Sequence, residues 1–191
     1  MNYTKLPKGY KKIGIIDLES KKSGEKRKVN LLAMILAVAI ALLSYKLRGF
    51  DEVTSALLGR AWVLLALMGV LFVYILLHEV VHGVFIRVLA KTKPVYGMKS
   101  IYLYAGTHAY LDRRSHAIIA LAPAVIFGVV LLALSFLLPA EWFWLVQIVQ
   151  IANIAGSAGD FYCVYRMLRM KKNVLIQDLG TGMKLYGPEN E

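Results

Sequence analysis

The sequence predicts an all-α integral membrane protein with about four transmembrane helices and a small cytoplasmic β-hairpin. The chain has 191 residues, is 58% hydrophobic and has a mean hydropathy of +0.57, values typical of a polytopic membrane protein. Its apolar residues gather in four runs of roughly the length that crosses a bilayer. The net charge of +11 comes from residues that bracket these runs. We therefore expect lipid as a partner and no nucleic acid.

Each apolar run accounts for one expected span. The four spans are residues 31–45, 61–89, 117–138 and 142–165. Pro123 and Gly128 interrupt the third run, and Trp142 and Trp144 stand at the start of the fourth. Tryptophan is enriched where a helix meets the membrane–water interface, so these two residues are expected interfacial anchors.

The distribution of lysine and arginine predicts how these spans are oriented. Basic residues are frequent in the segment 1–30, in the connection 91–115 after the second span and in the tail 166–191, and the other two connections are poorer in them. The positive-inside rule therefore places both termini in the cytoplasm of a multi-pass protein of the cell membrane. We expect one membrane domain at 31–165, flanked by basic cytoplasmic segments that contact anionic lipid headgroups.

A short motif in the second run indicates a metal site. The sequence HEVVH at 78–82 places His78 and His82 one helical turn apart on one face, where both can bind one Zn²⁺. Glu79 between them can act as a general base on a water molecule. Residues 61–77, which precede the motif, carry no charge, and ionisable groups in such surroundings usually serve a function. Two structural histidines are the alternative interpretation.

A catalytic zinc needs a third protein ligand beside two imidazoles. Asp160, in the fourth run, is the one other ionisable residue that lies well inside the four runs. Its separation from the basic residues that follow places it at about the depth of His82. His108 and His116, in the connection 91–115, are alternative third ligands, although each is otherwise expected to be solvated or interfacial.

Polar side chains recur along the fourth run at helical spacing. They are Gln147, Gln150, Asn153, Ser157 and Asp160. On a helix they form one stripe, which we expect to face the interior of the helix bundle. Asn153 either contacts the substrate or a developing oxyanion, or ties two helices together, and the sequence leaves both interpretations open.

The connection 91–115 is expected to contain the hairpin. Ser100–Tyr104 and Thr107–Leu111 alternate around Ala105 and Gly106, a pattern that predicts two strands and a turn. The edge of this hairpin could bind an extended substrate by strand addition, or the hairpin could lie on the membrane surface, anchored by its tyrosines. Two further segments have strand-like composition and are candidates for pairing with each other: 13–18 and 174–186.

These motifs resemble those of intramembrane zinc metalloproteases of the site-2-protease kind. The chain is more closely similar to a family of small prokaryotic membrane proteins described as putative zincin peptidases, through its segments LPKGYKKIGIIDL, HEVVHG, LAP, NIAGSAGD and QDLGTGMKLY. The site-2-protease resemblance implies His78 and His82 as zinc ligands, Glu79 as the base and Asp160 as the third ligand. Those proteases usually carry the aspartate in an LDG context, whereas this chain has GDF.

The expected function is therefore hydrolysis of a peptide bond by a zinc-activated water, within or beside the membrane. The substrate would be a protein or a peptide. A non-proteolytic zinc-binding membrane protein, either a transporter or an adaptor, is the alternative, because the same polar groups could form an ion path. Cys163 is the only cysteine, so a zinc cluster of several thiolates is excluded.

Overall fold

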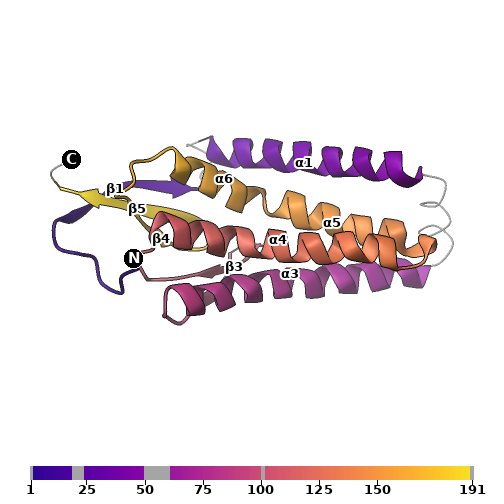
Figure 1. The fold of residues 1–191 in the computed structure, drawn as a ribbon, viewed down its shortest axis with the longest axis horizontal. Coiled ribbons are helices and arrows are strands. Elements are labelled where there is room, and N and C mark those ends of the chain that lie inside the picture. Colours follow the sequence, from indigo (N-terminus) through magenta and orange to yellow (C-terminus); the bar gives the residue numbers. More distant parts are fainter. Residues whose placement is uncertain (1, 19–23, 50–60, 100–101, 190–191) are drawn as a thin grey trace. The chain divides into compact units, whose positions relative to one another are not determined.

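The computed structural model describes residues 2–18, 24–49, 61–99 and 102–189, and most of them are helical (Figure 1). The long helices are α1 (Glu25–Arg48), α3 (Ala61–Leu89) and α4 (Arg113–Leu137). Within the described residues these three are long and apolar enough to cross a membrane. The helix expected from the second run has the same bounds in the structure. Helix α1 is longer than the first run at both ends, and α4 begins four residues before the third run.

The fourth expected span does not form one continuous helix. The short 3-10 turn Ala140–Trp142 leads into α5 (Phe143–Gly156), and α6 (Ala158–Leu168) follows after Ser157. The hydroxyl of Ser157 donates a hydrogen bond to the carbonyl of Asn153 at 2.8 Å. Ser44 and Ser135 make the same contact inside the continuous helices α1 and α4, so this bond by itself does not account for the break. Glycine has low helix propensity, and Gly156 and Gly159 flank the break. The polar stripe expected along this run is therefore divided between two helices.

Contacts between residues divide the chain into two compact units. Unit 1 comprises Met1–Val29, His78–Pro123 and Gly159–Glu191, and unit 2 comprises Asn30–Leu77 and Ala124–Ala158. All the described strands belong to unit 1, whereas unit 2 consists mainly of apolar helix. Each unit has its own apolar core.

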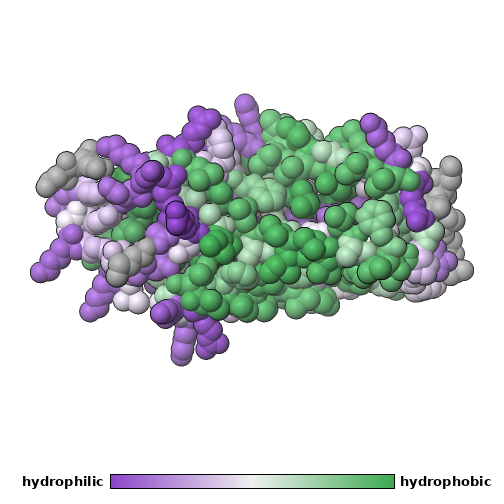
Figure 2. Space-filling model, viewed as in Figure 1, coloured by the Kyte–Doolittle hydropathy of each residue, from purple (hydrophilic) through white to green (hydrophobic). Residues whose placement is uncertain are grey.

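Unit 2 combines a buried polar network with an apolar exterior. Ser44 donates to the side-chain carbonyl of Gln147 at 3.0 Å, and the amide of Gln147 donates to Ser135 at 2.8 Å. Large apolar side chains of the helices are exposed, among them Leu65 at 70% and Phe136 at 69%, and Figure 2 shows such surface in green. An exterior of this kind with polar groups inside is consistent with membrane association.

Unit 1 contains a three-stranded antiparallel sheet in the order β1–β5–β4. Its strands are β1 (Tyr10–Asp17), β4 (Leu175–Asp178) and β5 (Gly182–Pro188). The central strand β5 pairs with β1 from Tyr10 to Asp17. On its other side it pairs with all four residues of β4, from Leu175 to Asp178. The predicted pairing between the strand-like segments near the two ends of the sequence is therefore confirmed.

The predicted hairpin exists, but its predicted register is wrong. Its strands are β2 (Val95–Lys99) and β3 (Tyr102–Gly106), and Ala105 and Gly106 lie within β3 instead of forming the turn. The segment 107–111, expected to be the second strand, contacts β4 instead. Thr107 donates to the carbonyl of Asp178 at 2.8 Å, and Leu111 exchanges backbone hydrogen bonds with Ile176.

This tertiary contact accompanies the shift and buries two large apolar side chains. Leu111 and Ile176 are both fully buried, at 0% exposure. Leu111 also belongs to the core of unit 1, with residues from the end of α3, from β3 and from the start of α4. Alternation in the sequence identified Tyr102–Tyr104 as strand, and Ser100 lies outside the described residues. The predicted strand 107–111 is wrong, because only Tyr110 and Leu111 form isolated bridges there and their partners are distant in sequence.

Asn2 links the end of α3 to the start of α4. Its amide nitrogen donates to the carbonyl of Leu89 at 2.8 Å and to the hydroxyl of Ser115 at 2.9 Å. Its side-chain carbonyl accepts from the backbone of Asp112 at 2.9 Å. The carboxylate of Asp112 in turn accepts from the backbone of Ser115 at 2.8 Å, as an N-cap does. Within unit 1, one side chain thus bridges the end of α3 and the start of α4.

We predict that Asn2→Ala destabilises the protein by about 1–3 kcal/mol, because it leaves part-buried polar groups without their partner. The measurement is thermal unfolding of the purified protein in detergent, where this loss should lower the Tm by several degrees. Thr4→Ala, at an exposed position of the same segment, is the control and should leave the Tm unchanged. Equal Tm values for the two variants and the wild type would contradict this role for Asn2.

Candidate metal centre

The second half of α3 carries the three residues of the HEVVH motif. His78 and His82 are four positions apart on this helix, so their rings lie on one face, edge to face, with centroids 5.0 Å apart. Both residues are buried, at 9% and 7% exposure. The atoms of His78, Glu79 and His82 that could bind a metal all lie within 4.8 Å of one another. Helical spacing alone therefore assembles a compact group of two imidazoles and a carboxylate.

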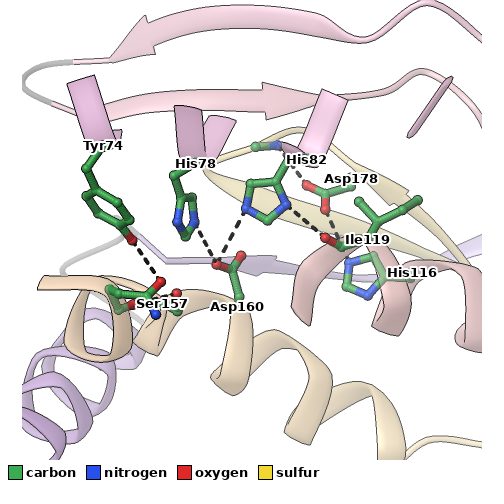
Figure 3. A network of polar contacts seen from close by, with 10 residues as sticks. Tyr74, His78, His82, His116, Ile119, Ser157, Asp160 and Asp178 are labelled. Atoms are coloured by element: carbon green, nitrogen blue, oxygen red, sulfur yellow. Dashed lines mark hydrogen bonds and ion pairs between the residues drawn. The ribbon is translucent and has the colours of Figure 1, made fainter. Parts of the chain in front are cut away.

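Asp160 approaches both imidazoles from a different helix (Figure 3). Its Oδ2 lies 3.8 Å from Nε2 of His78 and 3.6 Å from Nε2 of His82. The residue occupies the first turn of α6, where the helix dipole favours a negative charge. The break at Ser157 creates that helix start, so the interruption of the fourth run contributes directly to the position of the carboxylate.

This geometry fits a tetrahedral metal ion. Zinc binds imidazole nitrogen and carboxylate oxygen at about 2.0–2.2 Å, so two ligand atoms of one tetrahedral ion lie roughly 3.3–3.5 Å apart. The distances from Asp160 Oδ2 to the two Nε2 atoms are within a few tenths of an ångström of that range. The donor set of two imidazoles and a carboxylate is also one that zinc accepts in hydrolytic enzymes.

The hairpin β2–β3 packs against α3 beside this group. The backbone of Ala105 in β3 hydrogen-bonds to the carboxyl group of Glu79. Gly83 follows the motif directly, and a Cβ atom there would lie 1.8 Å from the hydroxyl oxygen of Tyr96 in β2. The absence of a side chain at position 83 thus lets the hairpin lie close to the helix, where it contacts Glu79.

His82 also has a partner on its other ring nitrogen. Its Nδ1 lies 2.9 Å from the backbone carbonyl of Ile119 in α4. A carbonyl can only accept a hydrogen bond, so this contact places the proton on Nδ1 and leaves Nε2 directed toward Asp160. Sequence reasoning missed Ile119, because a backbone group has no side-chain signature.

The two alternative histidines have other surroundings, and the expectation that each is solvated or interfacial is wrong for His116, which is 1% exposed. His116 is buried, and its Nε2 lies 3.2 Å from Oδ2 of Asp178, at the end of β4. His108 is exposed, and its backbone carbonyl accepts a hydrogen bond from Gln177 at 2.8 Å. Like Asp160, both lie outside the group of possible metal-binding atoms that the motif forms among the described residues. Of these three residues, however, only Asp160 contacts both imidazoles of the motif.

Asn153 is part of the polar network of unit 2. It is fully buried, its side-chain carbonyl accepts from the hydroxyl of Tyr74 at 3.0 Å, and its amide donates to the carbonyl of Ala124 at 3.1 Å. These contacts join α3, α4 and α5. Of the two interpretations of Asn153, they support the one in which it ties helices together.

Comparison with known proteins identifies a family whose model matches this chain. Residues 71–175 match the model of a family described as "Putative zincin peptidase", and this stretch contains the HEVVH motif and Asp160. Searches of curated proteins and of solved structures gave no match. The family model covers more than half of the chain. The chain therefore belongs to the putative zincin peptidase family.

Proposed function

We propose that this chain is a zinc metalloendopeptidase that hydrolyses peptide bonds within or beside the membrane. The observation that carries the proposal is the position of the Asp160 carboxylate, 3.6–3.8 Å from the Nε2 atoms of both His82 and His78. The side chain of Asp160 is 30% exposed, whereas both imidazoles are buried, and a carboxylate against two buried imidazoles is stabilised by a shared proton or cation. Membership of a zincin-type family supports zinc as that cation.

His78, His82 and Asp160 would hold the ion through two nitrogens and one oxygen. Three protein ligands leave a fourth tetrahedral position for water or substrate, the arrangement that distinguishes catalytic from structural zinc. When bound there, zinc polarises a peptide carbonyl and lowers the pKa of water toward about 7. Both histidines would bind the ion as neutral imidazoles, the form that binds metal.

Glu79 would act as the general base. It is partly exposed and lies next to both histidines, so its carboxylate can reach a water at the open position. It would take the proton of the attacking water and pass it to the leaving amine. The backbone of Ala105 interacts with this carboxylate, and we propose that this contact helps to orient it.

The substrate we propose is a protein or peptide segment that reaches the site in extended form, because helical peptide bonds are shielded by their own hydrogen bonds. The three helices of spanning length support a site at or in the membrane, with lipid around them. The basic segments at both ends of the sequence support cytoplasmic termini.

We predict that purified wild-type protein binds zinc in a near-stoichiometric amount and that His78→Ala or Asp160→Ala lowers the affinity. Loss of a direct ligand should exceed the roughly 10–100-fold effect typical of residues that only orient ligands. The measurement is elemental analysis after dialysis, followed by titration against a chelator of known zinc affinity.

His108→Ala is the matched control for the metal experiment, because His108 is an exposed histidine of the same chain. It should bind zinc as tightly as the wild type. An Asp160→Ala variant that folds and keeps wild-type affinity would eliminate Asp160 as a ligand. A wild-type protein that binds no zinc would remove the basis of the proposed function.

Glu79→Gln should keep zinc yet lose cleavage by about 10²–10⁴-fold, the usual contribution of a general base. The substitution preserves the shape of the side chain and removes only its basicity. The assay is mass-spectrometric detection of new termini in a complex peptide library and in transmembrane peptides, each incubated with the protein in nanodiscs.

A Glu79→Gln variant as active as the wild type would contradict the assignment of the base. A zinc-loaded wild type that cleaves neither library would contradict proteolysis itself. In that case, zinc flux across proteoliposomes that changes in Glu79→Gln would favour the transporter alternative, and unchanged flux would favour the adaptor.

A further inference from the structure

The proline inside α4 lies four residues after the carbonyl that His82 contacts. In an α-helix the backbone N–H of residue 123 would donate to the carbonyl of residue 119. Position 123 is proline, which has no N–H and whose ring also pushes against the carbonyl four residues earlier. The carbonyl of Ile119 is therefore left without its usual helical donor.

His82 supplies the missing donor. Its Nδ1 lies 2.9 Å from the Ile119 carbonyl oxygen, and the contact is inside the core, because Ile119 is 2% exposed and Pro123 is fully buried. A buried carbonyl without a donor costs about 1–3 kcal/mol. The imidazole N–H thus replaces the backbone N–H that the Ile119 carbonyl would otherwise accept from in α4. The buried Nδ1–H in turn needs an acceptor, which this carbonyl supplies.

We propose that Pro123 is a positioning residue for the metal centre. By removing the N–H of residue 123, it reserves the Ile119 carbonyl for His82. That contact fixes the proton on Nδ1 and directs Nε2 toward Asp160, 3.6 Å away. The inference rests on the proposed function, because the orientation of Nε2 affects the metal centre only if Nε2 binds the metal.

The alternative role of Pro123 is simple packing or bending of α4. The two roles differ in what they change. A packing residue affects the stability of the helix, whereas a positioning residue affects the affinity of the metal site even when the fold is retained. Partners that orient a metal-binding histidine typically contribute 10–100-fold in metal affinity.

The test is zinc affinity of Pro123→Ala, measured by chelator competition in detergent. The new N–H at position 123 would compete with His82 for the Ile119 carbonyl, so zinc should bind about 10–100-fold more weakly. Gly128→Ala is the control in the same helix, where an added Cβ makes an ordinary 3.5 Å contact with the amide of Asn153. It should bind zinc as the wild type does.

A backbone variant separates the lost N–H from the changed side chain. Lactic acid at position 123, introduced by semisynthesis or suppression, has the side chain of alanine and an ester oxygen in place of the N–H. It should restore near-wild-type zinc affinity. Affinity as weak as that of Pro123→Ala would overturn the proposal, as would Pro123→Ala with unchanged affinity.

A spectroscopic measurement keeps the inference testable if the alanine variant does not fold. Nitrogen-15 NMR of histidine-labelled, zinc-loaded wild type should show His82 with a protonated Nδ1 and a metal-bound Nε2. Coordination through Nδ1 would overturn the proposal.

The failure of this inference can be told apart from the failure of the proposed function. A wild-type protein that binds no zinc would contradict the proposed function as a whole. A wild-type protein that binds zinc with the same affinity as Pro123→Ala would contradict this inference alone.

Discussion

The group of two buried imidazoles and one partly exposed carboxylate is the constraint on which the rest of the structure depends. Asp160 Oδ2 lies within 3.8 Å of both His78 and His82, and placing such groups in an apolar chain is expensive unless each has a partner. Three helices position these groups. The two histidines lie one turn apart on α3, and Asp160 lies in the first turn of α6, which begins after the break at Ser157. The carbonyl of Ile119 in α4 contacts His82.

The helices could be predicted because hydrophobic length is a strong signal. The run 61–89 became α3 with the same bounds, and α1 and α4 differ from their expected runs only at the ends. The division of the fourth run into α5 and α6 was not predicted, although Gly156 and Gly159, which have low helix propensity, flank the break. The hairpin register failed because burial of Leu111 against Ile176 depends on a segment distant in sequence.

The residues of the candidate site could be predicted from the sequence where their own side chains are polar. His78 and His82 follow from helical spacing, and Asp160 stands out because ionisable residues are scarce in the apolar runs. The groups that contact these side chains were not accessible, because the carbonyl of Ile119 and the backbone of Ala105 belong to residue types without polar side chains. Pro123 was visible in the sequence, but only the structure relates it to His82.

The most direct test of this account is a diffraction experiment on zinc-loaded protein with an anomalous-difference map at the zinc absorption edge. The account predicts one strong peak in contact with Nε2 of His78, Nε2 of His82 and a carboxylate oxygen of Asp160, each at about 2.0–2.2 Å. A peak at another site, such as the His116–Asp178 pair, or a peak that contacts the histidines while Asp160 points away, would contradict it.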